Sequence, residues 1–451
     1  MVDLNEKKQR DQWGSKIGFI LAAAGSAVGL GNLWKFPYMA GSNGGGAFVL
    51  IYLALVLIVG FTLMAAEIVI GRHTQLNAIG AYKKIRKGWG WVGGLGVLAG
   101  FVILSYYSVV GGWVINYIVK AATGAFNTTD MELLGNMFGG LISSTWTPIV
   151  YHAIFMVITL GIVIGGISGG IEKFSKILMP ALFIMIILIV FRSVTLPGAA
   201  EGVRFFLKPD FAKINGRVIL AALGQVFFSL SLGMGCMITY GSYLSKEENI
   251  PQSSAWIPLL DTGVALLAGL AILPAVFALG FDPTGGPGLV FITLPAVFAK
   301  MPMGALFAII FFLLVLFAAV TSSISLLEVV VSYVVDDWKW SRSKATTIVA
   351  AAIFLVGVPA SFSMGPWSHI TLFRGLGIFD ALGFLSDQIL LPLGGLMLCI
   401  FIGWVWGTDN AVKEATNNGK VKFAIAPLWS FVIKYVAPLA IGYIFISGLI
   451  G

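Results

Sequence analysis

Residues 25–37 decide the fold of this chain, and they read GSAVGLGNLWKFP. Three glycines and a proline interrupt an apolar stretch that is otherwise suited to a membrane-spanning helix. A second interruption, SLSLGMG, occupies residues 229–235 inside another apolar stretch, five stretches further on. Because glycine and proline weaken helices, both stretches are predicted to form broken rather than continuous helices.

The composition of the whole chain explains why these stretches are interpreted as membrane spans. Of its 451 residues, 58% are hydrophobic and 11% are charged, and the mean hydropathy is +0.94. A soluble domain is usually about 45–50% apolar and about 25% charged. These values exclude a soluble enzyme, a disordered chain and a secreted disulfide module. They indicate an all-α polytopic membrane protein.

Other kinds of chemistry have little support in the sequence. Cys236 and Cys399 both lie in apolar runs, and the three histidines lack the spacing of metal ligands. No phosphate-binding loop of the kind that drives ATP-dependent pumps is present. Basic loops explain the net charge of +8 more simply than nucleic-acid binding does. We therefore expect no catalytic residues, no organic cofactor and no nucleic-acid partner.

Eleven apolar stretches are long enough to cross a bilayer, since a transmembrane helix needs about 20 residues. They occupy residues 15–38, 44–70, 92–123, 148–167, 174–196, 217–244, 256–281, 304–335, 344–362, 378–407 and 423–449. We expect one transmembrane domain over residues 1–451. It is predicted to consist of a first repeat at about 15–196, a second at about 217–407 and an extra helix at about 423–449.

Basic residues predict the orientation. The stretch 124–147 contains Asp130 and Glu132 but no lysine or arginine. By contrast, the segments before span one and after span two are rich in basic residues: Lys7, Lys8, Arg10 and Lys16, then Arg72, Lys83, Lys84, Arg86 and Lys87. The positive-inside rule therefore places the amino terminus in the cytoplasm, and eleven spans place the carboxyl terminus outside. The expected location is a plasma (bacterial inner) membrane.

The two interruptions allow two interpretations. Gly25 and Gly29 form a Gly-x3-Gly pair, which can simply let helices pack closely. However, both interruptions also contain hydroxyl or amide side chains and occupy corresponding positions, which is typical of inverted-repeat transporters. Freed carbonyls there can coordinate a cation, and half-helix amino termini can hold an anionic group. An amino acid with a co-transported cation suits such a site.

Six motifs together resemble the neurotransmitter:sodium symporter family, especially its LeuT-like and MhsT-like bacterial amino-acid branch. They are WGSKIGFIL from Trp13, GSAVGLGNLWKFP from Gly25, NGGGAF from Asn43, the pair Tyr106-Tyr107, GQVFFSLSLGMG from Gly224 and TSSIS from Thr321. The resemblance covers essentially the whole chain. It implies a LeuT-type 5+5 inverted repeat with helices 1 and 6 broken and eleven transmembrane helices.

The resemblance implies two sodium sites. The first would use Ala27, Asn32, Ser229 and Asp261, and the second Gly25, Val28, Ala318, Thr321 and Ser322. Hard cations prefer oxygen ligands, which these segments supply as carbonyls, hydroxyls and an amide. The run 321–323 has a simpler interpretation, in which its hydroxyls bond back to their own helix.

The same resemblance implies a substrate site between the broken helices. The substrate carboxylate would meet the Gly31 amide and the Tyr107 hydroxyl, beside the first sodium ion. The whole predicted site comprises Leu30, Gly31, Ile103, Tyr107, Phe228, Ser229, Ser231, Met234, Ser322, Ser325 and Leu326. Its apolar character predicts neutral hydrophobic L-amino acids, aromatic ones included, as substrates.

Charges inside a membrane are costly and are functional candidates by default. In chloride-dependent relatives a bound anion completes the site, whereas Asp261 supplies a fixed carboxylate here. Transport is therefore expected to be chloride-independent. Glu67 corresponds to the family glutamate that hydrogen-bonds the unwound helix, although a structural role for it is at least as plausible.

The resemblance also implies gates at both ends of the site. Arg10 and Asp336, with Trp13 and Tyr243, match the cytoplasmic gate. At the outer gate Lys35 stands where relatives commonly have arginine, and Gly383 falls where they have aspartate. Asp380 and Asp387 lie one turn to either side. Lysine cannot form the bidentate fork of arginine, so a weaker or rearranged outer gate is expected.

The resulting prediction is a sodium-coupled symporter that works by alternating access in the lipid bilayer. Two alternatives stay open at this stage: a symporter for another small amine or betaine, and an amino-acid sensor that binds without transport. The sequence leaves the preferred amino acid, the ion stoichiometry and the oligomeric state open.

Overall fold

The computed structural model describes residues 11–283 and 288–450, which are helical and contain no strand. Nine helical runs in this part of the chain are long and apolar enough to cross a membrane. They are Gly46–Thr74, Gly90–Ala122, Thr147–Ile164, Ile167–Val194, Ile250–Ala278, Gly304–Trp338, Arg342–Phe362, Ile378–Ala415 and Ala426–Leu449. Each of the nine coincides with a predicted span.

The other two of the eleven predicted spans are the ones predicted to be broken. In the first, α1 (Lys16–Ala27) is followed by the π-helical turn η1 (Gly31–Lys35) and α2 (Phe36–Ser42), with a bend of 51°. In the sixth, α11 (Gly216–Ser229) and α12 (Cys236–Gly241) are separated by six residues, and each is too short to span alone. Nine spans and one bent pair support ten of the eleven predicted spans, and the eleventh stays a prediction.

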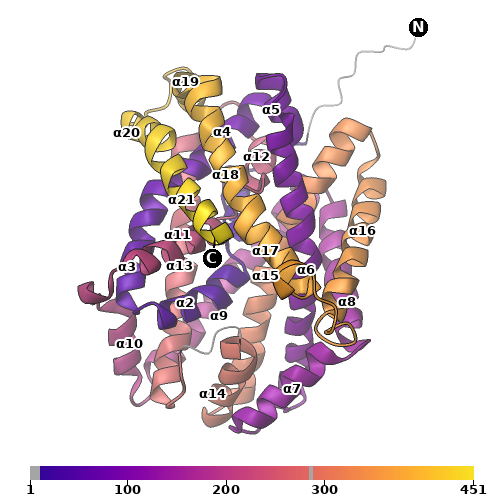
Figure 1. The fold of residues 1–451 in the computed structure, drawn as a ribbon, viewed down its shortest axis with the longest axis vertical. Coiled ribbons are helices and arrows are strands. Elements are labelled where there is room, and N and C mark those ends of the chain that lie inside the picture. The colour runs from indigo at the N-terminus through magenta and orange to yellow at the C-terminus, as the bar shows by residue number, and fades with distance from the viewer. Residues whose placement is uncertain (1–10, 284–287, 451) are drawn as a thin grey trace.

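Figure 1 shows the long helices running side by side. The α-helices that make up the nine spans are α3 (Gly46–Leu55), α4 (Phe61–Thr74), α6 (Gly90–Ala122), α8 (Thr147–Ile164), α9 (Lys173–Val194), α13 (Ile250–Ala278), α15 (Gly304–Trp338), α16 (Arg342–Phe362), α17 (Ile378–Phe384), α18 (Leu391–Ile400), α19 (Thr408–Ala415), α20 (Ala426–Phe431) and α21 (Ala437–Ile450). The helices α5 (Ala78–Ile85) and α19 (Thr408–Ala415) lie at one end, here called the α5 end. At the opposite end, the α7 end, are α7 (Met131–Ser143) and α14 (Leu294–Lys300).

Local geometry explains the break in the sixth span. Ser231, Gly233 and Gly235 have φ of +53°, +80° and +72°, in the left-handed region that ends an α-helix. In the first span, glycine allows close approach instead. A Cβ on Gly29 would lie 2.5 Å from Ser322 Oγ. The two breaks therefore follow from glycine at positions where a side chain would not fit.

The breaks lie inside the helix bundle. The helix α1 packs against α9, α13 and α15, and α15 in turn packs against α6 and α8. The unwound segments are thus enclosed by protein, which is the condition under which irregular backbone is tolerated at membrane depth.

Candidate functional site

Three side chains from different spans meet at the breaks. The Asn32 Nδ2 atom donates to Asp261 Oδ1 at 2.8 Å and to Ser229 Oγ at 3.1 Å. The Ser229 hydroxyl donates to the other carboxylate oxygen of Asp261 at 2.8 Å. All three residues are buried, as is Ala27 at the end of α1. The structure therefore brings together the three side chains predicted for the first sodium site.

This cluster has the chemistry of a cation site. A carboxylate is costly inside a membrane, and it persists there when it is paired or serves an ion pathway. Asp261 is completely buried and faces an amide and a hydroxyl but, in the described part of the chain, no basic side chain within ion-pair distance. A monovalent cation among these oxygen atoms would balance the carboxylate charge.

Backbone carbonyls at the first break bond to side chains of other spans. Gln225 Nε2 donates to the Gly31 carbonyl at 2.9 Å, and the Ser231 hydroxyl donates to the Ser26 carbonyl at 3.0 Å. Breaking a helix frees carbonyls, and buried ones need new partners. The break is thus held open by hydrogen bonds from the sixth span.

The residues predicted for the second sodium site also lie together. The Ser322 hydroxyl donates to the Val28 carbonyl at 3.1 Å and approaches the Gly25 carbonyl at 3.5 Å. The Thr321 hydroxyl donates instead to carbonyls of its own helix, at Phe317 and Ala318. The simpler interpretation of the hydroxyl run therefore describes Thr321 in this structure, whereas Ser322 links α15 to the first break.

The predicted substrate residues surround the same breaks. The Leu30 amide donates to the Tyr107 hydroxyl at 3.3 Å. The Phe228 ring covers Gly31, since a Cβ there would lie 2.8 Å from it. The Ser325 hydroxyl accepts from the Ser26 hydroxyl at 2.6 Å. The remaining predicted pocket residues are all buried: Ile103, Ser231, Met234 and Leu326.

Glu67 holds the second break. Its carboxylate accepts hydrogen bonds from the Gly233 amide at 2.7 Å and from the Met237 amide at 3.3 Å. These amides lie at the unwound segment and at the start of α12, where backbone donors have no helical partner. Glu67 thus makes the contact with the unwound helix that the resemblance implied.

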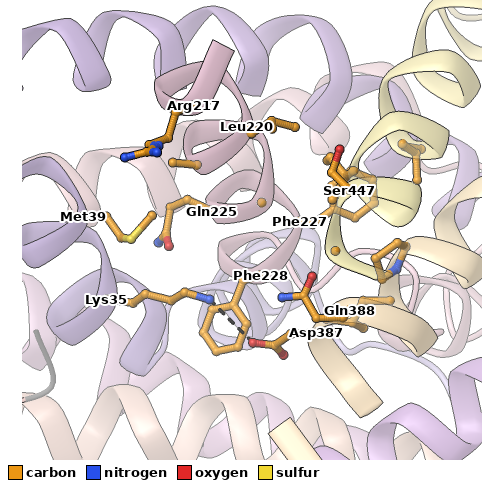
Figure 2. Close-up of a pocket in the computed structure, with 17 residues that line it drawn as sticks. Lys35, Met39, Arg217, Leu220, Gln225, Phe227, Phe228, Asp387, Gln388 and Ser447 are labelled. Carbon is orange, nitrogen blue, oxygen red and sulfur yellow. Dashed lines mark ion pairs between the residues drawn. The ribbon is translucent and has the colours of Figure 1, made fainter. Parts of the chain in front are cut away.

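One closure lies toward the α7 end and consists of Lys35, Phe228 and Asp387. Lys35 Nζ lies 3.6 Å from Asp387 Oδ2 and 4.2 Å from the centre of the Phe228 ring. Figure 2 shows Lys35 extending along that ring toward Asp387, at the edge of a cavity of about 430 Å³. Asp387 rather than Gly383 is thus the acidic partner, which places it one turn from the family position.

A second closure lies toward the α5 end and consists of Trp13, Tyr243, Glu328 and Arg342. The Trp13 indole donates to the Tyr240 carbonyl at 2.9 Å, and its ring packs edge-on against Tyr243. The Tyr243 hydroxyl donates to Glu328 Oε1 at 2.7 Å, and Arg342 contacts both Glu328 oxygens, the closer at 2.5 Å.

The predicted gate residues at this end are only partly described. Asp336 accepts a hydrogen bond from the Asn77 amide at 3.0 Å, which joins α15 to the start of α5. Arg10, its predicted partner, lies outside the described residues.

Several residues of the site have no role assigned from the sequence, among them Gln225, Arg342 and Asp387. Gln225 lies in the recognised motif of span six, but the pattern gave its amide no role. Arg342 was one of many basic residues next to a span, and Asp387 was one of two candidate acids. The role of each of these residues depends on which side chain of another span it contacts, and a single sequence does not indicate such contacts.

The fold and the candidate site, which lies between broken helices with a cluster of paired side chains on either side, are those of a class of membrane transport protein. The model of the Sodium:neurotransmitter symporter family matches residues 10–133 and 143–451, and the chain belongs to this family.

Relatives and a solved structure agree with this assignment. The chain is 44% identical over 442 residues to the uncharacterized sodium-dependent transporter YhdH of Bacillus subtilis, covering 98% of each chain. It is 41% identical to an uncharacterized sodium-dependent transporter of Haemophilus influenzae, covering 98% of this chain and 99% of the relative. The crystal structure of MhsT in complex with L-phenylalanine superposes with a TM-score of 0.89 at 43% identity, covering 97% of this chain and all of the other. The LeuT-type fold is therefore confirmed.

Proposed function

We propose that this protein is a sodium-coupled symporter that imports neutral hydrophobic L-amino acids, aromatic ones included, by alternating access. The observation that carries the proposal is the buried cluster of Asn32, Ser229 and Asp261 at the breaks of two spans. A cation bound there would neutralise the charge of Asp261. The amide of Gly31, which precedes Asn32 in the sequence, would meet the substrate carboxylate. Sodium and substrate would thereby stabilise the same closed arrangement.

The apolar pocket supports the substrate class. Ile103, Phe228, Met234 and Leu326 present hydrocarbon or aromatic surface, and no described acidic or basic side chain is among the predicted pocket residues. Similarity to MhsT, whose crystal structure contains L-phenylalanine, favours the same class of ligand. The predicted roles of the two sodium sites, and a count of two sodium ions, are part of this proposal.

Chloride independence follows from the fixed carboxylate. The Tyr52 hydroxyl donates to the Ser229 hydroxyl at 3.3 Å, and the Ser229 hydroxyl donates to Asp261 at 2.8 Å. A bound chloride ion beside a buried carboxylate would be repelled at short range. We expect sodium alone to satisfy the electrostatics of the site.

The proposed orientation places the α5 end in the cytoplasm of a bacterial inner membrane and the α7 end outside. Native Cys236 and Cys399 are buried, so single introduced cysteines can report exposure. An impermeant maleimide added to intact cells should label Lys213→Cys but not Lys420→Cys. Labelling of Lys420→Cys but not of Lys213→Cys would show that the protein has the opposite orientation.

Purified protein in proteoliposomes with an imposed sodium gradient tests the function. Each of the twenty amino acids is offered in labelled form, and hydrophobic and aromatic ones should accumulate. Preferential uptake of glutamate would contradict the substrate class. Sodium-dependent binding without accumulation would favour a sensor, and uptake only of an amine or betaine would favour that alternative.

A further inference from the structure

The connection between the fifth and sixth spans carries charges of an unexpected sign. Arg204, Lys208 and Lys213 lie within residues 195–215, and Arg217 begins the next helix turn. In the proposed orientation this short connection is outside, where the positive-inside rule predicts few basic residues. The other outer stretch considered above, residues 124–147, has none. Topology therefore does not explain these cations.

Two of these cations lie between a mainly apolar hollow and a polar one. Arg204 and Lys208 are four residues apart at the end of α10 (Ala199–Leu207), and both line both hollows. The first hollow, about 740 Å³, is lined mostly by apolar residues, among them Val194, Leu196, Val203 and Leu207. The second, about 450 Å³, also contains Glu201, Asp210 and Lys213. Figure 1 shows α10 in the half of the molecule that carries α7 and α14.

The cations are exposed, and apolar side chains accompany them. Arg204, Lys208 and Lys213 are exposed, and within the described part of the chain none of them forms an ion pair. Leu207 and Phe211 are 53% and 69% exposed. Leu207 lies three residues after Arg204 and lines the same hollow, so basic and apolar side chains are adjacent at the end of α10, a combination that suits the membrane interface.

We infer that the Arg204–Lys208 pair and the apolar hollow beside it bind one anionic phospholipid of the outer leaflet. The lipid phosphate would accept hydrogen bonds from the arginine fork and the lysine ammonium, and an acyl chain would occupy the hollow lined by Val203 and Leu207. Glu201 and Asp210 repel a phosphate from the polar hollow, which directs it to the apolar side. A soluble anion would gain nothing from the apolar surface.

The bound lipid would contact a part of the protein that is packed against the outer half of the proposed transport path. A Cβ on Gly45 would lie 2.2 Å from the Phe205 carbonyl, and one on Gly46 would lie 2.5 Å from the Lys208 carbonyl. The end of α10 is thus packed directly on the turn that joins α2 to α3, and α2 follows Lys35. This regulatory role rests on the proposed function, whereas the binding site rests only on the proposed orientation.

Binding is tested with the full-length protein in nanodiscs of phosphatidylcholine into which phosphatidylglycerol is titrated, with retained lipids counted by native mass spectrometry. The Arg204→Gln/Lys208→Gln variant should bind phosphatidylglycerol about tenfold more weakly or worse, since each cation near an anionic surface contributes substantially. The matched control Lys420→Gln/Lys422→Gln removes the same charge from two exposed residues elsewhere and should bind like the wild type. Equal retention by the Arg204→Gln/Lys208→Gln variant would overturn the inference.

Two further arms identify the ligand. Leu207→Asn, which changes a half-exposed residue of the apolar hollow, should also weaken phosphatidylglycerol binding. Inorganic phosphate at equal concentration should fail to displace the lipid. Equal displacement by inorganic phosphate would show an anion site and contradict the lipid assignment. Melting temperatures in phosphatidylcholine alone confirm that each variant is folded.

Regulation is tested separately by uptake. Wild-type uptake should rise when phosphatidylglycerol is added, whereas the Arg204→Gln/Lys208→Gln variant should match the wild type in phosphatidylcholine alone and show no rise. An identical rise in both proteins would contradict the regulatory role. If neither protein transports any amino acid, the proposed function fails while the lipid-binding result still decides the site.

Discussion

The two closures of this transporter differ in burial and geometry. In the α5-end closure, Arg342 and Glu328 form a bidentate pair in which Glu328 is fully buried and Arg342 is 21% exposed. In the α7-end closure, Lys35 and Asp387 form a single contact at 3.6 Å, and each side chain is 28% exposed. Solvent-exposed pairs contribute about 0–1 kcal/mol, whereas breaking a buried pair costs about 3–5 kcal/mol.

This difference implies that the α7 end opens more readily than the α5 end. The Phe228 ring compensates in part, because the Lys35 ammonium lies over it and a cation–π contact contributes about 0.5–1 kcal/mol at an exposed site. Closure at the α7 end thus depends on a ring that also covers Gly31 in the proposed substrate site. Closure at the α5 end depends on charges that lie away from that site.

The largest expected effect comes from Glu328→Gln. This change leaves the partly buried Arg342 guanidinium without its carboxylate partner. It should destabilise the α5-end closure by about 3 kcal/mol, at the lower end of the range for buried pairs because Arg342 is partly exposed. Hydrogen exchange should accelerate in α1 and α12, and concentrative uptake should fall by about 100-fold. Glu247→Gln, which changes an exposed acid near the same end, is the matched control. Unchanged exchange in α1 would contradict the assignment of this closure.

Trp13→Ala should have the next largest effect. The ring packs against Phe19 and Tyr240, and its indole donates to the Tyr240 carbonyl. Removing a half-buried tryptophan should cost about 2 kcal/mol, less than the 3–5 kcal/mol of a fully buried aromatic residue. Uptake should fall by about 30-fold, and Trp13→Phe should recover most of it because the ring packing is kept. No recovery by phenylalanine would show that the indole hydrogen bond, not the packing, closes this end.

Lys35→Met should have a moderate effect at the opposite end. It removes both the ion pair and the cation over Phe228, which together are worth about 1 kcal/mol. Bound substrate should dissociate toward the α7 end about fivefold faster, as measured by stopped-flow release. Lys35→Arg should restore slow release, because arginine can form a bidentate pair with Asp387. A destabilisation of the α7-end closure by Lys35→Met as large as the one expected at the α5 end for Glu328→Gln would contradict the proposed difference between the two closures.

Asp387→Asn should have the smallest effect. It breaks the ion pair but leaves Lys35 over the Phe228 ring, so the expected loss is about 0.5 kcal/mol, or roughly twofold in release rate. Asp380→Asn changes an exposed acid about two turns away on the same helical segment and should change nothing. Equal effects of the two variants would show that Asp387 is not the specific partner of Lys35.

Much of the fold could be predicted from the sequence because the bilayer imposes strong constraints. Long apolar stretches predicted nine spans to within eight residues at each boundary, and glycine with proline predicted the break in the first span. The sixth predicted span is harder to recognise as one membrane crossing. Its helices α11 and α12 are separated by a segment in which Ser231, Gly233 and Gly235 have a left-handed backbone conformation. Glycine is expected at such positions, but Ser231 also adopts the left-handed conformation, and its hydroxyl donates to the Ser26 carbonyl.

The site could be predicted only as far as the family motifs reach. Asn32, Ser229 and Asp261 lie together as expected: Asn32 and Ser229 are part of recognised motifs, and the role of Asp261 was implied by the resemblance to the family. Asp387 and Arg342 required the structure, because pairing depends on how spans separated by many residues rotate against one another. Register within a helix moves a side chain by 100° per residue, so an acid one turn away can replace a family aspartate.

Sodium-driven uptake by the wild type and Asp261→Asn, each in chloride and in gluconate, tests the central claim most directly. Labelled L-phenylalanine should enter wild-type proteoliposomes only with an inward sodium gradient, and equally in both anions. Asp261→Asn should lose this uptake in gluconate, because the site then lacks its fixed negative charge. Wild-type uptake that ignores the sodium gradient, or an Asp261→Asn variant that transports normally in gluconate, would contradict a cation site built on Asp261.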